Sequence, residues 1–496
     1  PRFCRFARRP RGLGLPALML ACTTMLTSCT VGPDYMSPSD PPVRTFLSGG
    51  DRVAGTQLVR NGAVSARWWE SFGSPSLNGL VEAGLQNNAD LEAAIAAVRV
   101  AQANALVLRA GLFPTVTGSF DSTRQKVASQ VSPDVVSGAD LYSLHTGQLS
   151  VSFVPDLFGG TRRAIESAEA QAVAQAFQTE GVYLTLVSNI VLAAIQEASL
   201  REQIAVTQRQ INLQTQLLGV LRNQNERGQI AMPDVVVQET AVAQAKLLLA
   251  PLERQLAQQQ NLLAQLTGRF PSEGTGTRFQ LRGFRLPRKL PLSLPADLVR
   301  QRPDVRAAEE NVRATNAQIG VALANRLPQI TLTANVGSTA TALSQLFAPG
   351  TGLWLIGGNV AQTIFDAGAR EQRQRAAEAQ TVQAAALYRS AVLQAFQNVA
   401  DTLRALQTDT RAVQAALDAE ATSQRNLDLI RKQLDQGQIS IAILVPAQQA
   451  VLQSSLARVQ AQAQRLSDTV ALFQSLGGGW WNRPKIDGQP ETKVLQ

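Results

Sequence analysis

The residues that could perform covalent or metal chemistry are few in this sequence. It has a single histidine, His145, and three cysteines that all fall within the first 29 residues, at positions 4, 22 and 29. It contains no nucleophile elbow, no phosphate-binding loop and no spaced set of metal ligands. The sequence therefore predicts no catalytic residue, no metal site and no enzyme. His145 is expected in a surface loop.

Cys29 has the most informative context. Five arginines precede an apolar stretch, about 13–25, that is too short to span a bilayer, and this order is typical of a signal peptide over 1–28. The stretch ends in Leu26-Thr27-Ser28-Cys29, which is similar to a bacterial lipobox; Cys22 fits less well. We expect Cys29 to carry an N-acyl and an S-diacylglycerol lipid, with no other cofactor. The alternative is a plain signal peptide with a chance cysteine.

The composition favours long helices and excludes nucleic-acid binding. The chain has 496 residues, of which 45% are hydrophobic and 5% aromatic. The five arginines of the leader carry more than half of the formal charge of +9, so no basic block remains in the body. No later window has 18 uninterrupted apolar residues. A body that crosses a membrane must then do so as a closed β-barrel.

The chain contains an internal duplication. Several residues within 90–114 have an identical residue 214 positions later, and several within 168–230 have one 209 positions later. The matched pairs include Asp90 and Asp304, Pro114 and Pro328, Glu169 and Glu378, and Gly228 and Gly437. Two sets with constant offsets argue against chance similarity. The offset changes where we expect surface loops, which tolerate changes of length.

Each half predicts six elements in one order: helix, strand, polar loop, strand, very long helix and shorter return helix. The first half has them at 89–111, 115–120, 121–145, 148–153, 160–227 and 234–267, and the second at 304–325, 329–334, 338–352, 354–364, 369–436 and 440–476. Gly228 and Gly437 end the long helices. Alternation such as Leu149, Ser150 and Val151 predicts the strands. Two soluble hairpins remain the alternative for these strands.

Four strands per chain predict a shared pore. They cannot close a barrel alone, and lipid cannot satisfy the open edges of a sheet, so several copies must contribute to one barrel. At least three copies are needed to leave a lumen. The return helix covers about half of a long helix, so the helix before the strands should stack end-on with it. Segments 269–293 and 477–496 should wrap the outside.

The turns at 223–233 and 432–444 are predicted to lie farthest from the membrane. Their charged and aliphatic residues make them the candidate contacts with a partner protein, with Gly228, Gln229, Gly437 and Gln438 at their tips. The alternative is that these turns only close the helical hairpins. Arginines outside the leader, such as Arg163 and Arg302, are expected on solvated faces.

Motifs along nearly the whole chain resemble those of TolC-type outer-membrane efflux proteins, in particular the lipoprotein branch of nodulation-T-like factors. In order, they are Cys29-Thr-Val-Gly-Pro-Asp-Tyr35, Trp68-Trp69-Glu-Ser-Phe72, Leu294-Pro-Ala-Asp-Leu298, Arg302-Pro-Asp-Val-Arg-Ala-Ala-Glu309, Phe365-Asp-Ala-Gly368, Ala395-Phe-Gln-Asn-Val-Ala-Asp401 and Leu476-Gly-Gly-Gly-Trp-Trp481. The resemblance implies a homotrimer in the outer membrane, with a 12-stranded barrel and an antiparallel α-helical periplasmic tunnel. It also implies a periplasmic membrane-fusion adaptor and an inner-membrane pump as partners.

In that family, acidic rings six and nine residues past the turn glycine narrow the periplasmic entrance. Here these positions are Asp234 and Val237 in the first half, and Ile443 and Pro446 in the second. The sequence therefore predicts a less acidic entrance, gated by an apolar constriction and by polar groups such as Gln448 and Gln449. The alternative is that Asp234 only caps a helix.

Together these features predict an α+β membrane protein made of two repeats. The expected segments are a signal peptide (1–28), a lipidated periplasmic wrap (29–88), the first repeat (89–268), an equatorial connector (269–293), the second repeat (294–476) and a periplasmic tail (477–496). The expected function is a passive exit duct for drugs or other toxic small molecules in a tripartite efflux system. The alternative is a lipid-anchored, periplasmic coiled-coil structural or adaptor protein without pore activity.

Overall fold

The computed structural model describes residues 30–39, 41–43, 45–48, 57–60, 62, 64–126, 141–287, 289–293 and 295–483. Cys29 and the signal peptide lie outside the described residues. The chain divides into two compact units, and each long helix contributes residues to both. The first unit includes 101–172 and 311–384, together with the segment up to Met36; the second includes Ser37–Val100, Val173–Glu310 and the remainder from Ala385.

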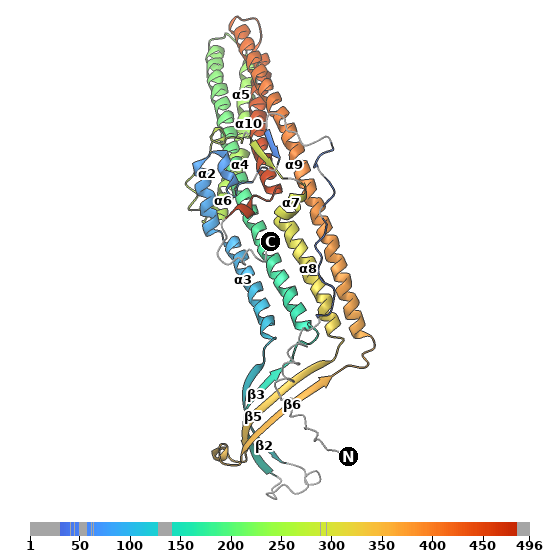
Figure 1. Cartoon of the computed structure of the whole chain (residues 1–496). Coiled ribbons are helices and arrows are strands. Elements are labelled where there is room, and N and C mark those ends of the chain that lie inside the picture. Colours follow the sequence, from blue (N-terminus) through green and yellow to red (C-terminus); the bar gives the residue numbers. More distant parts are fainter. Residues whose placement is uncertain are drawn as a thin grey trace, which may run out of the picture. The chain divides into compact units, whose positions relative to one another are not determined.

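The two halves of the chain repeat one order of elements (Figure 1). The first half has α2 (Pro75–Asn87), α3 (Ala89–Ala110), β2 (Thr115–Lys126), β3 (Leu141–Phe153), α4 (Gly160–Glu226), α5 (Met232–Leu247) and α6 (Leu249–Leu266). The second half has α7 (Pro295–Gln301), α8 (Pro303–Ala324), β5 (Gln329–Ala340), β6 (Gly352–Ala361), α9 (Ala369–Asp435) and α10 (Leu444–Ser475). Short strands β1 (Gln57–Arg60) and β4 (Lys289–Leu292) and several 3-10 turns complete the described chain.

The first unit contains an antiparallel sheet with strand order β2-β3-β5-β6. The strands are longer than the alternation of residues predicts. Polar residues 121–126 continue to pair with 141–146, so the predicted loop over 121–145 is wrong at both ends, and His145 lies in β3 opposite Ser122. The loop predicted from 338 likewise begins only after Ala340. Backbone pairing does not require apolar side chains, so the alternation ends before the ladder does.

Helices α4 and α9 have 67 residues each, a length of about 100 Å. Each helix is preceded by an aspartate and then by a glycine with positive φ, Gly159 before α4 and Gly368 before α9. Asp156 accepts hydrogen bonds from the backbone N–H groups of Thr161 and Arg162, and Asp366 accepts from those of Gly368 and Arg370. These bonds satisfy amide groups that a helix N-terminus leaves free.

The return helix of the first half is not continuous, contrary to the prediction of one helix over 234–267. It breaks at Leu248 into α5 and α6. Pro251 lacks a backbone N–H, so the carbonyl of Leu247 loses its helical donor. The equivalent position in the second half is Gln460, and α10 runs without a break from Leu444 to Ser475.

In the second unit, the two halves have equivalent end-on joints between helices. The side chain of Asn88, before α3, donates to the carbonyl of Leu266 at the end of α6, with an N–O distance of 3.2 Å. The guanidinium of Arg302, before α8, donates to the carbonyl of Ser475 at the end of α10 at 3.1 Å. Asn88 and Arg302 differ by the offset of 214, and Leu266 and Ser475 by 209. The predicted end-on stacking is therefore present in both halves.

Segments from both sides of the duplication cover one face of the second unit. β1 pairs in parallel with β4, an association that the sequence did not predict. Trp68 is buried and stacks on Phe473 with ring centroids 5.2 Å apart. Arg483 forms an ion pair with Glu180 and lies over the ring of Tyr183. These contacts attach the N-terminal, middle and C-terminal wrapping segments to the helices.

Three helical stretches are long and apolar enough to cross a membrane by length and composition: α3, a window of α4, and Met232–Leu266. The sequence expectation counted only uninterrupted apolar runs and was too strict for these windows, which tolerate a few charges. Most of the α4 window, 61%, is buried inside the protein. Length and hydropathy alone therefore do not decide which elements span the membrane.

Candidate functional site

The sheet of the first unit has one apolar face and one polar face. The strand register places apolar or small residues from all four strands on the first face: Val116, Phe120, Leu149, Val151, Ile330, Leu332, Val336, Trp354, Ile356 and Val360. The opposite face carries mostly polar residues: Thr115, Thr117, Ser119, Gln148, Ser150, Ser152, Thr331, Thr333, Asn335 and Asn359. Eight of the apolar side chains are between 45% and 76% exposed in the isolated chain. The protein itself leaves this apolar face of the sheet largely uncovered.

The two hairpin tips of the second unit have the same backbone geometry. Gly228 and Gly437 both have a φ of +69°, the left-handed conformation that ends a helix. The N–H of each following glutamine, Gln229 and Gln438, donates to a carbonyl five residues back, at 2.9 Å in both turns. All four residues are exposed. Both tips thus expose backbone groups and glutamine side-chain amides in the same turn geometry.

An apolar cluster beneath the tips holds the two hairpins together. It joins α4, α5, α9 and the start of α10 through Leu218, Leu221, Val235, Val242, Leu427, Ile441, Leu444 and Ala447. Exposed aliphatic side chains lie beside this cluster, among them Met232, Val236 and Ile443. The tips therefore combine a packed interior with an apolar outer surface.

The predicted entrance residues differ in their surroundings. Asp234 is half-buried in the first turn of α5, where the N-cap is Ala231 and no side chain caps the helix, so Asp234 is not the cap. Ile443 and Pro446 are exposed, and Gln449 donates to the side chain of Gln244 at 3.1 Å.

Gln448 is different because it is only 2% exposed and points into the helix packing. Its side-chain oxygen has no partner among the described residues. Within one chain, Gln448 therefore cannot line an entrance, whereas the other four predicted entrance residues present at least part of their surface.

A short segment after Cys29 is held against the first unit by one arginine. Arg163, only 5% exposed, donates to the carbonyls of Val31 and Gly32, each at 3.3 Å, and to the carboxylate of Asp34 at 2.7 Å. Burial lowers the pKa of Arg163, but its bonds to Asp34 and Glu166 outweigh this and raise the pKa above the ordinary value. We call residues 30–34 the N-terminal strap.

The strap requires glycine on both sides of its closest contact. A Cβ atom at Gly320 would lie 2.8 Å from the carbonyl oxygen of Val31 and 2.7 Å from Cγ of Arg163. Gly320→Ala should therefore displace the strap and destabilise this region by about 1–3 kcal/mol, although alanine favours a helix. Gly219→Ala in α4 is the matched control, because a Cβ there meets open space.

The measurement is limited proteolysis, read by the rate of cleavage within residues 30–36. Gly320→Ala should be cleaved faster than the parent protein and Gly219→Ala at the parent rate. Equal rates in both variants would show that the strap does not depend on the contact at Gly320.

Two of the arginines predicted to be solvated, Arg163 and Arg302, are buried, and the expectation is wrong for these two. Arg163 holds the strap, and Arg302 is 8% exposed at its joint. Each arginine satisfies backbone carbonyls through contacts across more than 130 residues of sequence. Long-range contacts of this kind leave no local signal in the sequence.

A second feature that sequence reasoning missed is a pair of carboxyl groups between α9 and α10. Asp409 is 8% exposed, and one of its carboxyl oxygens has no hydrogen-bond partner among the described residues. Burial, with a shared hydrogen bond and the charge of Asp468, raises the pKa of Asp409 to about 7, while Arg465 acts in the opposite direction. The duplication gives no counterpart, because the positions 209 earlier are Leu200 and Gln259.

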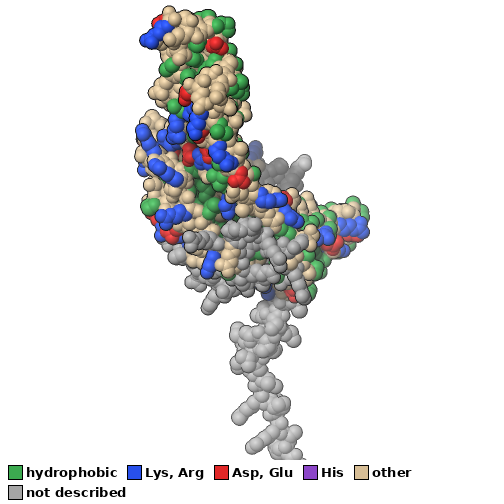
Figure 2. Space-filling view, turned by 90° about the horizontal axis from the view of Figure 1, so that it is seen from above, with side chains coloured by type: hydrophobic (Ala, Val, Ile, Leu, Met, Phe, Trp, Pro, Cys, Tyr) green, Lys and Arg blue, Asp and Glu red, His purple; other side chains and the backbone are tan. Residues whose placement is uncertain are grey.

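The described residues hold no group of three or more His, Cys, Asp and Glu placed to bind a metal ion. His145 lies against Ser122, with its Nδ1 atom 2.9 Å from the hydroxyl oxygen. On the face shown in Figure 2, Lys and Arg side chains are interspersed with acidic and apolar side chains rather than gathered in one block.

Comparisons with known proteins identify what this chain is similar to. The model of the outer membrane efflux protein family matches residues 80–269 and 294–478. The toluene efflux pump outer membrane protein TtgC of Pseudomonas putida is 30% identical over 468 residues, which are 94% of this chain and 96% of the relative. The pyoverdine export outer membrane protein OpmQ of Pseudomonas putida is 29% identical over 84% of this chain and 88% of that protein.

Solved structures agree with these relatives. The outer-membrane channel OprN superposes with a TM-score of 0.82 at 26% identity, over 91% of this chain and all of that chain. The open state of the MtrE outer membrane channel of Neisseria gonorrhoeae gives 0.79 at 25% identity, over 92% of this chain and all of that one.

Proposed function

This chain belongs to the outer membrane efflux protein family, and from this premise we propose that three copies form one exit duct for small toxic molecules. The protein is an outer-membrane efflux channel with a large periplasmic part, and its family works in efflux pumps rather than in catalysis. Its relatives are named for toluene efflux and pyoverdine export. From these relatives we propose only the class of cargo for this protein, namely small molecules that must leave the cell.

The two-faced sheet is the observation that carries the proposal. The four strands of this sheet have 10 to 13 residues each, and a transmembrane strand needs about 9–11. An apolar face against lipid and a polar face against a water-filled lumen is the pattern of an outer-membrane barrel. A periplasmic coiled-coil protein without a pore would leave this face without an apolar partner.

The trimer follows from the open edges of this sheet. Among the described strands, β2 and β6 each pair on one side only, and unpaired backbone groups are costly in lipid. Closed rotational symmetry pairs β2 of one copy with β6 of the next. Three copies give 12 strands, enough to enclose a lumen, whereas eight strands leave an interior filled by side chains.

Exposed apolar residues on the helices next to the edge strands support the same assembly. α3 exposes Val100, Leu106 and Val107, and α9 exposes Leu387 and Leu393, all at 60% or more. We propose that α3 of one copy packs against α9 of the next in the periplasmic part of the duct.

We propose that Cys29 carries the lipid anchor and that the N-terminal strap fixes its position. Only one residue separates Cys29 from Val31, whose N–H donates to the carbonyl of Phe158 at 3.1 Å. Acyl chains on Cys29 would therefore enter the membrane close to the strands. We also propose that the tips at Gly228, Gln229, Gly437 and Gln438 contact a periplasmic adaptor, which connects the duct to an inner-membrane pump.

The test uses the purified full-length protein. We expect it to migrate as a heat-modifiable trimer and to form ion-conducting channels in planar lipid bilayers. A protein that stays monomeric and gives no conductance at any concentration would contradict the proposed duct.

Asp234 offers a separate test of the entrance. Asp234→Asn should lower the preference for cations over anions by about twofold, since a charge that is partly open to solvent usually contributes less than ~1 kcal/mol. Glu253→Gln removes an exposed charge from α6 and is the matched control. Reversal potentials in a salt gradient measure the effect; an unchanged potential in Asp234→Asn would remove Asp234 from the entrance.

A further inference from the structure

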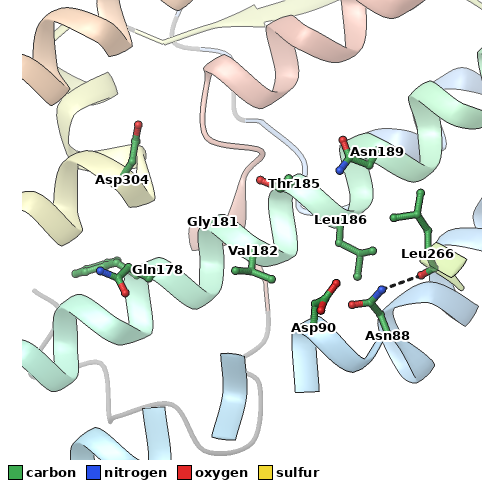
Figure 3. Close-up of a pocket in the computed structure, with 11 residues that line it drawn as sticks. Asn88, Asp90, Gln178, Gly181, Val182, Thr185, Leu186, Asn189, Leu266 and Asp304 are labelled. Carbon is green, nitrogen blue, oxygen red and sulfur yellow. Dashed lines mark hydrogen bonds between the residues drawn. The ribbon is translucent and has the colours of Figure 1, made fainter. Parts of the chain in front are cut away.

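We propose that a hollow beside α4 in the second unit binds organic cations with an apolar body. It has a volume of about 440 Å³, within the range that holds a drug-sized molecule. α4 forms its floor, and the start of α3 and the start of α8 contribute to its sides (Figure 3).

The floor of the hollow exists because of one glycine. A Cβ atom at Gly181 would meet nothing within 4 Å, so any larger side chain there would project into the hollow. Val182 and Leu186 of α4 and Leu266 of α6 add apolar surface around it (Figure 3). These groups favour the apolar body of a ligand over water.

The charge of the hollow selects cations. Asp90 and Asp304 both line it, from positions related by the offset of 214, and none of the described lysines or arginines does. Asp304 pairs with Arg302 at 2.6 Å, whereas Asp90 has no ion-pair partner among the described residues. Asp90 is therefore the carboxylate free to meet a ligand cation.

Most of the α4 residues that line the hollow face away from the wrapping segments; the exception is Phe177, whose ring packs against Trp480 with centroids 5.6 Å apart. Arg483 binds Glu180, and the C-terminal segment packs on Leu184. Gln178, Val182 and Thr185, which line the hollow, lie roughly 140–200° around the helix from Glu180 at 100° per residue.

This placement connects the hollow to transport and rests on the proposed duct. The wrapping segments cover one face of the helices, so the lumen of the duct cannot run along that face. The wrapped face is therefore the outer face of the duct. The hollow then opens toward the lumen, once in each copy. A weak site for amphipathic cations along the lumen would hold such cargo against the wall during its passage.

The experiment is a binding measurement on the purified full-length channel in detergent, by fluorescence anisotropy with the cationic dye rhodamine 6G. The anionic dye fluorescein, which has a related ring system, should bind more weakly. Gly181→Leu should weaken rhodamine binding at least about tenfold by filling the hollow. Asp90→Asn should weaken it by about tenfold, equivalent to ~1.4 kcal/mol, and should remove much of its salt dependence.

Matched controls exclude general effects of these substitutions. Gly219→Leu changes another α4 glycine with open space around it, and Glu92→Gln removes an exposed charge two residues from Asp90; both should bind the dye as the parent does. If Gly181→Leu or Asp90→Asn binds as tightly as its control, the site is not this hollow. Bilayer conductance of the parent protein tests the duct separately from the cation site. If the parent conducts ions but Gly181→Leu and Asp90→Asn bind the dye as tightly as the parent, only the proposed site is contradicted.

Discussion

Ile356→Arg is expected to prevent most of the protein from assembling in the outer membrane. Ile356 lies near the middle of β6, is 75% exposed, and belongs to the apolar face of the sheet. An arginine facing lipid near the bilayer midplane costs about 2–4 kcal/mol, and a trimer would contain three of them. Heat-modifiable trimer in isolated outer membranes measures the effect, which we expect to be a loss of most of the signal.

The neighbouring residue provides the control. Leu355 is also exposed, but the register places it opposite Asn335, on the polar face. Leu355→Arg introduces the same charge one residue away and should assemble nearly as the parent does. If both variants assemble equally well, or if Leu355→Arg is the more harmful one, the apolar face is not the face in contact with lipid.

Asp409→Asn is expected to stabilise the protein at pH 8 and to stabilise it clearly less at pH 5. The folded-state pKa of about 7 is higher than the ordinary value of 3.8. Between these values the unfolded chain releases the proton and the folded chain keeps it, so rising pH favours unfolding by ~1.4 kcal/mol per pH unit. The penalty is complete above pH 7. Asparagine does not ionise, so the variant avoids it.

Thermal unfolding followed by circular dichroism at both pH values measures this prediction. Asp428→Asn, an exposed α9 carboxylate that accepts from Gln424, is the control and should show no such pH dependence. A variant Asp409→Asn that is destabilised equally at pH 5 and pH 8 would mean that Asp409 is ionised in the folded protein throughout this range.

The sequence predicted the elements whose cause is local. The long helices end just before Gly228 and Gly437 because each glycine adopts a positive φ, which glycine accepts most readily. The duplication fixed the order of elements in the second half once the first was interpreted. The halves of β2, β3 and β5 next to the helices were predicted as well, because side chains alternate there between an apolar and a polar face.

The parts that the sequence could not predict depend on distant contacts. The strap joins Val31 to Arg163 and Gly320, and the carboxyl pair joins Asp409 to Asp468. No local sequence pattern predicts that these distant residues are in contact. The break at Leu248 is an exception, since Pro251 could have indicated it. The lipid on Cys29, the entrance residues and the adaptor-contact tips stay predictions.

The equivalent joints at Asn88 and Arg302 have a mechanical consequence. In each half, α4 or α9 is one continuous helix, whereas the antiparallel helices beside it meet end-on through hydrogen bonds, α3 with α6 in the first half and α8 with α10 in the second. A continuous helix resists bending along its whole length, but such a joint opens with the loss of a few bonds of ~1 kcal/mol each. One joint uses a neutral amide and the other a guanidinium paired with Asp304. The two hairpins of one chain should therefore flex with unequal stiffness, and salt should soften only one of them.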